Sequence, residues 1–387
     1  MQTAPAVRER LTEVLSEIVA IDARNPWLIP GAPGETEIAA WFAARVEALG
    51  IPVELEPISP GRPNVIARLG SGEPPVLCLN AHLDTVGDAG WPDRCYSAAL
   101  TGDRLVGLGA ADDKGHCAAL LVALEQLLER KIALRGTLLL AWVADEEAES
   151  QGTSELIDRH PMDACVVAEP LGLGRALVSH QGFGWLDVTV AGRAAHGSAP
   201  EKGIDAIARL AELTRRLDAH AERTFRAHPH PLNGVTVYHA STVRGGTDYA
   251  TYPADATLGI EIGTQPGETI ADRVAEIEAI VTGMRVELPD LEARVDVRLH
   301  RPPFEANGHE RLWDALDGAS RDLLGRSPEP VGENAWMDTG LLGAAGIPSL
   351  SIGAAGENFH APDESVDMAE LASVTELLIA TVERYLA

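Results

Sequence analysis

Residues 115–144 read GHCAALLVALEQLLERKIALRGTLLLAWVA, and this stretch decides the fold. In its first half, residues 115–129, apolar side chains recur at the spacing of an amphipathic helix. In its last part, residues 137–144, nearly every side chain is apolar and polar ones do not alternate with them. A strand of that composition is typical of a parallel sheet that helices cover on both faces. The stretch therefore predicts an α/β layer.

Similar patterns occur on both sides of this stretch. The apolar runs are candidates for buried strands, and two segments near the N-terminus have weaker strand character. The buried-strand candidates are residues 76–80, 166–168 and 347–353, the weaker ones are 52–56 and 64–69, and helical spacing occurs at 6–21 and 36–49. Strands that alternate with helices indicate a mostly parallel sheet. We expect this α/β domain to comprise residues 1–176 and 303–387.

The middle of the chain has a different pattern. Three segments alternate apolar and polar residues, as half-exposed strands do, and two helical patterns lie between them. The strand candidates are residues 185–190, 256–262 and 294–299, and the helices are 203–221 and 268–284. This pattern predicts a smaller α+β domain, residues 177–302, inserted into the first domain.

The charge of the chain limits its partners. Its 387 residues include 31 Lys and Arg against 58 Asp and Glu, which makes a formal charge of −27 with His neutral. Phosphate binding needs a basic surface, so we expect no nucleic-acid partner. An acidic surface favours solubility and cationic small molecules.

The cysteines and the apolar runs bear on the compartment. None of the cysteines, Cys78, Cys95, Cys117 and Cys165, forms a CxxC pair, so we expect free buried thiols in a reducing compartment. The charged start of the chain does not resemble a signal peptide. No apolar run approaches the roughly 18 residues that span a bilayer, so we expect a cytoplasmic protein without a membrane partner.

Histidines and acids follow the predicted strands. His82 and Asp84 come after the first buried strand, in AHLDTV. Glu146 and Glu147 come after the strand of the opening stretch, and Glu169 comes after the next one. In open α/β sheets, ligands bind beyond the carboxyl ends of the strands. These side chains are therefore placed where such a sheet has its site.

Two loops add further candidates. Asp112 lies in the glycine-rich turn GLGAADDKGH before the long helix, and His360 lies in ENFHAPDES. Each residue alone has an ordinary explanation, such as a solvated loop histidine or an acid at a helix N-terminus. Together they form a mixed histidine and carboxylate set of the kind that binds zinc, manganese or cobalt.

With these motifs the chain resembles the zinc-dependent family of aminoacylases, acetylornithine deacetylases, succinyl-diaminopimelate desuccinylases and carboxypeptidase G. The resemblance covers nearly the whole chain. The family's motifs occur in the same order, with HLDTV at 82–86, GxGAxDxKG at 107–115, DEE at 145–147, EP at 169–170 and HAPDE at 360–364. Such an ordered set is far more specific than any single motif.

The resemblance implies a dinuclear metal centre. By analogy with the family, His82, Asp112 and Glu169 hold one divalent ion. Asp112, Glu147 and His360 hold the other, so that Asp112 bridges the two. The ions are expected to be zinc, with cobalt or manganese as alternatives.

The resemblance also assigns three catalytic roles. Glu146 is the general base, Asp84 orients His82, and His196 stabilises the developing oxyanion. His196 lies in the inserted domain, which in relatives is a lid and dimerisation domain, and in dimeric relatives this histidine serves the partner subunit. The first domain is then the catalytic domain, and a homodimer is expected.

The inserted domain departs from the family at its substrate contacts. Relatives carry an Asn in the motif GGxxxNxxP, where this chain has Ala250. The strand that supplies a carboxylate-binding Arg in relatives here reads Glu261-Ile262-Gly263. Arg193 or Arg244 could replace these contacts, and Asp338 in the segment WMDT could meet a cationic group of a substrate.

Three functions remain open. The first is hydrolysis of the amide bond of an N-acyl amino acid, as in acetylornithine deacetylases. The second is the same chemistry on a dipeptide, as in dipeptidases and carboxypeptidases. The third is a non-catalytic metal-binding relative, which the intact Glu146 disfavours because a binding protein needs no general base.

Overall fold

The apolar run of the opening stretch forms strand β6 (Thr137–Val143). The computed structural model describes residues 4–88, 90–91 and 94–386, and the structural statements below concern these residues. Every residue of β6 is buried. Successive side chains such as Leu139 and Leu140 belong to separate apolar cores on the two faces of the sheet, which explains the absence of alternation.

Within the described chain, β6 is part of a nine-stranded sheet with the order β1-β2-β6-β3-β7-β15-β8-β13, in which β14 also pairs with β8. The central strands β6, β3, β7 and β15 are parallel, and the flanking strands are antiparallel. The predicted parallel sheet is thus confirmed at its centre. The strands are β1 (Val53–Ser59), β2 (Arg62–Gly70), β3 (Val76–His82), β7 (Ala164–Ala168), β8 (Arg175–His180), β13 (Phe304–Glu305), β14 (Glu329–Glu333) and β15 (Ser349–Ile352).

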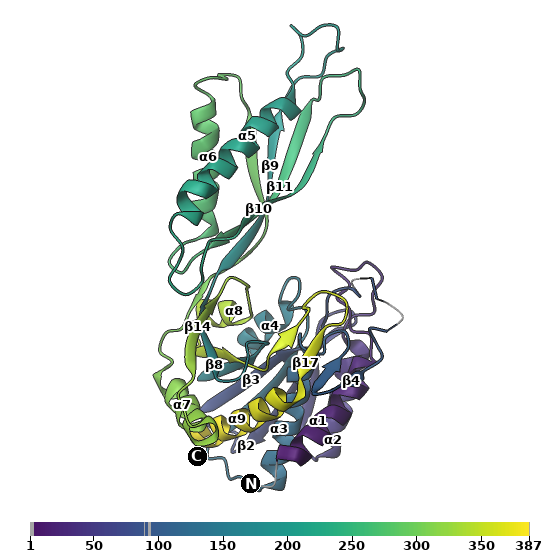
Figure 1. Cartoon of the computed structure of the whole chain (residues 1–387), viewed down its shortest axis with the longest axis vertical. Coiled ribbons are helices and arrows are strands. Elements are labelled where there is room, and N and C mark those ends of the chain that lie inside the picture. Colours follow the sequence, from purple (N-terminus) through teal and green to yellow (C-terminus); the bar gives the residue numbers. More distant parts are fainter. Residues whose placement is uncertain (1–3, 89, 92–93, 387) are drawn as a thin grey trace. The chain divides into compact units, whose positions relative to one another are not determined.

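Helices cover both faces of the parallel centre (Figure 1). On one face, α1, α3 and α9 pack against one another, and Trp142 stacks on Phe42 of α2 with ring centroids 5.1 Å apart. On the other face, Leu156 of α4 and Leu342 of α8 join the second core. The helices are α1 (Ala4–Val19), α2 (Thr36–Ala48), α3 (Lys114–Glu129), α4 (Gln151–Arg159), α7 (Glu310–Leu324), α8 (Thr339–Ala344) and α9 (Met368–Leu386).

A small sheet joins two distant parts of the chain. Its strand order is β16-β17-β5-β4, with Ser365 of β17 opposite Val106 of β5. The Gly107 N–H also donates to the Glu364 carbonyl at 3.0 Å. This pairing brings the loop with His360 to the turn with Asp112. The strands are β4 (Ala99–Thr101), β5 (Arg104–Val106), β16 (Gly356–Glu357) and β17 (Ser365–Asp367).

The inserted region forms a four-stranded antiparallel sheet with the order β10-β11-β9-β12. Alternate residues of β9, such as Val188, pack with Leu213 of α5 and Ile277 of α6 in a separate apolar core. The predicted fold class, an α/β fold with an inserted α+β part, is confirmed. The elements are β9 (Gly182–Ala191), α5 (Ala206–Ala221), the π-helical turn Glu222–Arg226, β10 (Tyr238–Gly245), β11 (Asp255–Thr264), α6 (Ile270–Met284) and β12 (Ala293–Arg301).

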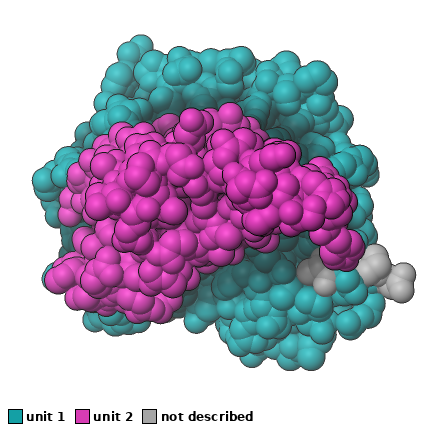
Figure 2. Space-filling model, turned by 90° about the horizontal axis from the view of Figure 1, so that it is seen from above, with its two compact units in different colours: residues 1–178, 306–331, 337–387 teal, residues 179–305, 332–336 magenta. Residues whose placement is uncertain are grey.

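The chain divides into two compact units, coloured separately in Figure 2. The first consists of residues 1–178, 306–331 and 337–387, and the second of 179–305 and 332–336. The segment 332–336 therefore differs from the sequence-based division, which placed it in the first domain. It belongs to the second unit because Glu333 accepts a backbone hydrogen bond from Gln181 at 3.2 Å and the Trp336 indole donates to Pro302 O at 3.0 Å.

Two sequence-based expectations concern cysteines and membrane segments. All four cysteines are buried thiols that form no disulfide, as predicted. Among the described helices, none combines the length and the apolar character required to cross a membrane.

Candidate metal centre

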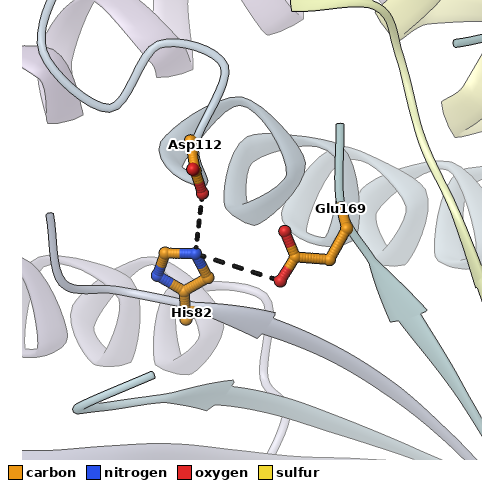
Figure 3. A group of neighbouring side chains, drawn as sticks. All are labelled: His82, Asp112 and Glu169. Carbon is orange, nitrogen blue, oxygen red and sulfur yellow. Dashed lines mark hydrogen bonds and ion pairs between the residues drawn. The ribbon is translucent and has the colours of Figure 1, made fainter. Parts of the chain in front are cut away.

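The first candidate ligand set lies at the carboxyl end of the parallel strands. His82 is the last residue of β3 and is almost fully buried. Its Nε2 is 3.0 Å from Asp112 Oδ1 and 4.0 Å from Glu169 Oε1, so the three side chains point toward one another (Figure 3). One ligand atom from each residue lies within 4.8 Å of the others.

The second set shares Asp112 with the first. His360 Nε2 lies 3.3 Å from Asp112 Oδ2 and 3.3 Å from Glu147 Oε1. His360 is half exposed, whereas Glu147 is 8% exposed. The five predicted metal ligands therefore form two overlapping groups of three, with Asp112 in both.

The turn with Asp112 is held by a buried carboxylate. Glu364 accepts backbone N–H bonds from Gly109, Ala111 and Asp112 at 2.9, 2.9 and 3.0 Å. Gly109 has φ +75°, and a Cβ there would lie 2.6 Å from a methyl group of Thr85. Only glycine fits both conditions, which accounts for the glycine at position 109 of this turn. The Asp112–Asp113 peptide bond is cis.

Asp84 is placed between the candidate ligand His82 and the acids that follow β6. Its carboxylate accepts the backbone N–H groups of Glu146 and Glu147 at 3.1 and 3.2 Å. His82 Nδ1 lies 3.1 Å from the Asp84 carbonyl oxygen and 3.5 Å from its Oδ1. Asp84 therefore holds the Glu146–Glu147 backbone, and its orienting of His82 stays a prediction.

The electrostatics of this cluster favour a cation. Burial and neighbouring acids raise the pKa of Glu146 and of Glu169 well above the usual value. Burial opposes the charged form of His82, but hydrogen bonds to Asp112 and Asp84 outweigh it and raise the pKa of His82 well above 6.5. Acids so close together repel one another unless positive charge lies between them.

The residues fit two divalent ions. Among the described side chains, the buried Glu147 Oε1 accepts no hydrogen bond, and it faces the ring nitrogen of His360. Imidazole and carboxylate are the donors that catalytic zinc sites use, and no cysteine belongs to either set.

The proposed oxyanion residue lies in the other unit. His196 is exposed, its Nδ1 lies 2.8 Å from Ser198 Oγ, and it forms an isolated bridge with Thr251. Arg193 donates to Lys202 O at 2.7 Å, and Ala250 N–H donates to Asp248 at 2.7 Å. The roles of His196 and of the substrate contacts stay predictions.

Sequence reasoning missed a buried polar network beneath the centre. Asn25 Nδ2 donates to Asp84 at 2.8 Å and to Asp145 at 3.0 Å. Arg62 pairs with Glu35 at 2.5 Å and with Asp145 at 2.7 Å. No motif marks these residues; the charge of Arg62 at the start of a buried strand is the one signal available.

Asp338, suggested for a cationic group of a substrate, is buried in the first unit. The Thr153 hydroxyl donates to Asp338 Oδ2. Its charge contributes to the raised pKa of Glu146 and of Glu169, so Asp338 adds to the negative charge around the centre.

An α/β fold with overlapping histidine and carboxylate sets at its strand ends defines the class of metal-dependent hydrolases. Comparison with protein families agrees with this class. Residues 78–384 match the peptidase family M20/M25/M40, and the chain belongs to this family of metallopeptidases and deacylases.

Individual relatives extend over most of the chain. An acetylornithine deacetylase from Photorhabdus laumondii is 26% identical over 381 residues, which are 95% of this chain and 92% of the relative. A succinyl-diaminopimelate desuccinylase from Gluconacetobacter diazotrophicus is 28% identical over 93% and 94% of the two chains. The crystal structure of a tripeptidase from Staphylococcus aureus has the same fold, with a TM-score of 0.80 and 22% identity over 97% and 98% of the chains.

Proposed function

We propose that this enzyme hydrolyses the amide bond of an N-acyl amino acid, in the manner of acetylornithine deacetylases. The observation that carries the proposal is the pair of ligand sets sharing Asp112, with Glu146 directly before the ligand Glu147. Two divalent ions, zinc or else cobalt or manganese, would acidify a bound water and polarise the amide carbonyl.

We propose that Glu146 carries out the proton transfers of the reaction. Its carboxylate accepts a proton from water as the oxygen bonds to the carbonyl carbon. It then donates that proton to the leaving nitrogen as the C–N bond breaks, which leaves a carboxylic acid and an amine. His196 would donate a hydrogen bond to the carbonyl oxygen while negative charge develops there.

The choice of substrate rests on the relatives. Two named relatives, a deacetylase and a desuccinylase, remove acyl groups from amino acids, which supports an N-acyl amino acid here. A dipeptide is the alternative, since a tripeptidase shares the fold, and a non-catalytic metal-binding protein is the least supported function.

A substrate panel tests the proposal. The full-length protein is stripped of metal, reloaded with Zn²⁺, Co²⁺ or Mn²⁺, and assayed on acetyl-ornithine, acetyl-methionine and several dipeptides. We expect N-acyl amino acids to be cleaved fastest, and Glu146→Gln to lower kcat by roughly 10²–10⁴-fold while the metal content is unchanged. Metal binding without hydrolysis of any amide contradicts the enzyme function, and full activity of Glu146→Gln contradicts the mechanism.

We also propose a homodimer formed through the second unit. β10 is an edge strand of its sheet, and beside it a hollow of about 280 Å³ is lined by Ile207, Leu210 and Val243. Val243 is 71% exposed and Ile207 47% exposed. An exposed edge strand with apolar neighbours favours pairing with another chain. Light scattering should give a dimer for the natural protein and a monomer for Val243→Asp; a monomeric natural protein contradicts this proposal.

A further inference from the structure

His116 of α3 lies beside the metal centre without being a candidate ligand, and its ring is fully buried. Its Nδ1 lies 2.5 Å from Asp113 Oδ1, and its Nε2 accepts the Ala354 N–H at 3.0 Å. A ring nitrogen that accepts a hydrogen bond carries no proton, so the proton lies on Nδ1 and is donated to Asp113. Burial, which lowers the pKa of His116 to about 4, favours the same neutral ring.

On one side, His116 is connected to two ligands of the first set. Asp113 accepts a hydrogen bond from His116 Nδ1–H with Oδ1, and one from the His82 backbone N–H with Oδ2 at 3.0 Å. Asp113 also follows Asp112 directly in the chain. The contact between His116 and Asp113 therefore constrains His82 and Asp112, whose side chains approach to 3.0 Å.

On the other side, His116 is connected to Glu169. Ile352, at the end of β15, accepts the Glu169 N–H at 3.1 Å, and Ala354 two residues later donates to His116. A Cβ on the intervening Gly353 would lie 1.9 Å from Glu169 O and 2.5 Å from His116 Nε2. The strand end, the imidazole and the Glu169 backbone therefore pack without room for one additional carbon atom.

We propose that His116 is a positioning residue for the divalent ion held by His82, Asp112 and Glu169. Its neutral imidazole joins the turn that carries Asp112 to the strand end that holds Glu169, and so sets the separation of these ligands. Hydrogen-bond partners that orient metal ligands influence metal affinity strongly. The inference rests on the proposed function, because it requires a metal ion at these residues.

The test measures Zn²⁺ affinity of the full-length, metal-stripped protein by competition with a chelating dye. His116→Phe keeps a buried ring and removes both hydrogen bonds, whereas His116→Gln keeps one donor and one acceptor. Each is combined with His360→Ala, which leaves the first set intact, or with Glu169→Gln, which leaves the second set. Val122→Ala, a buried change farther along α3, is the matched control.

We expect His116→Phe to lower Zn²⁺ affinity roughly 10–100-fold in the His360→Ala background and by a clearly smaller factor in the Glu169→Gln background, where Asp112 is the one remaining ligand connected to His116. His116→Gln should recover part of the affinity, and Val122→Ala should leave it unchanged. Equal losses in both backgrounds, or none in either, would overturn the inference. If His116→Phe fails to fold, the test rests on His116→Gln in the His360→Ala background. Unchanged Zn²⁺ affinity of that variant overturns the inference, and reduced affinity supports it.

The test also separates this inference from the proposed function. A natural protein that binds no Zn²⁺ contradicts the proposed metal centre. A natural protein that binds Zn²⁺ and hydrolyses an amide, with His116 variants of unchanged affinity, contradicts the role of His116 alone.

Discussion

Among single residues, Asp84 positions the metal centre by holding the backbone of Glu146 and Glu147. Its carboxylate accepts three N–H groups, from Glu146, Glu147 and the side chain of Asn25. In Asp84→Asn, an amide NH₂ would face at least one of these donors. We expect Zn²⁺ affinity to fall roughly 10–100-fold in a calorimetric titration. Asp158→Asn, on the exposed face of α4, is the control, and equal affinity of the two variants contradicts the prediction.

Glu35 makes the stability of the protein depend on pH. Burial raises the pKa of Glu35 from 4.5 to about 7, although hydrogen bonds from Arg62 act in the opposite direction. The folded protein thus holds this proton more tightly than the unfolded chain. The stability that Glu35 contributes is complete below about pH 4.5 and is lost as the pH rises through about 7.

Glu35→Gln should therefore gain stability relative to the natural protein as the pH rises. Between pH 4.5 and 7.5 the difference in free energy of unfolding should change by roughly 3 kcal/mol in favour of the variant. Urea denaturation at several pH values measures this change. The exposed Glu37→Gln on α2 is the control. A difference that does not vary with pH would show that Glu35 is ionised throughout.

At the scale of elements, the start of α4 lies very close to the end of β6. A Cβ on Gly152 would lie 2.3 Å from Ala144 O and 2.6 Å from Asn64 Oδ1. Gly152→Ala should lower the free energy of unfolding by about 1–3 kcal/mol, because the helix must move away from the strand. Gly283→Ala in α6, where the Cβ meets open space, should instead stabilise by about 0.5–1 kcal/mol. Urea denaturation compares the two, and similar values contradict the predicted contact.

The sequence predicted where helices and strands lie better than it predicted which of them lie side by side. The apolar runs at 76–80 and 137–144 became β3 and β6, because continuous burial leaves a clear local pattern. The strand order was not predicted, because local patterns do not say which strands become neighbours, and the pairing of β17 with β5 joins segments more than 250 residues apart. The five proposed ligands, which the structure brings together in two groups, were selected through their strand-end positions and motif order. Asn25 and Arg62 were not found, because only packing brings them beneath the centre.

At the scale of the whole molecule, metal removal should lower thermal stability. Metal ions at a free concentration about a thousand times their dissociation constant would stabilise the fold by about 4 kcal/mol. For a unit of this size that raises the melting temperature by roughly 10 °C. Calorimetry should show the loss on chelation and its recovery with Zn²⁺. A Glu169→Gln/His360→Ala protein, which lacks one ligand of each set, should show little response to either treatment. A natural protein whose melting temperature does not respond to chelation contradicts the metal centre.

The insertion begins and ends in neighbouring strands. His180 at the end of β8 lies opposite Phe304 of β13, in an antiparallel pair. Neighbouring strands are about 5 Å apart, a distance that a tight two-residue turn spans. Evolution could therefore remove or exchange residues 181–303 as one segment, because the two ends of the remaining chain lie close enough to be joined by a short turn. All five proposed metal ligands and Glu146 lie outside this segment, whereas His196, proposed to stabilise the oxyanion, lies inside it, so the metal centre can be inherited separately from that residue.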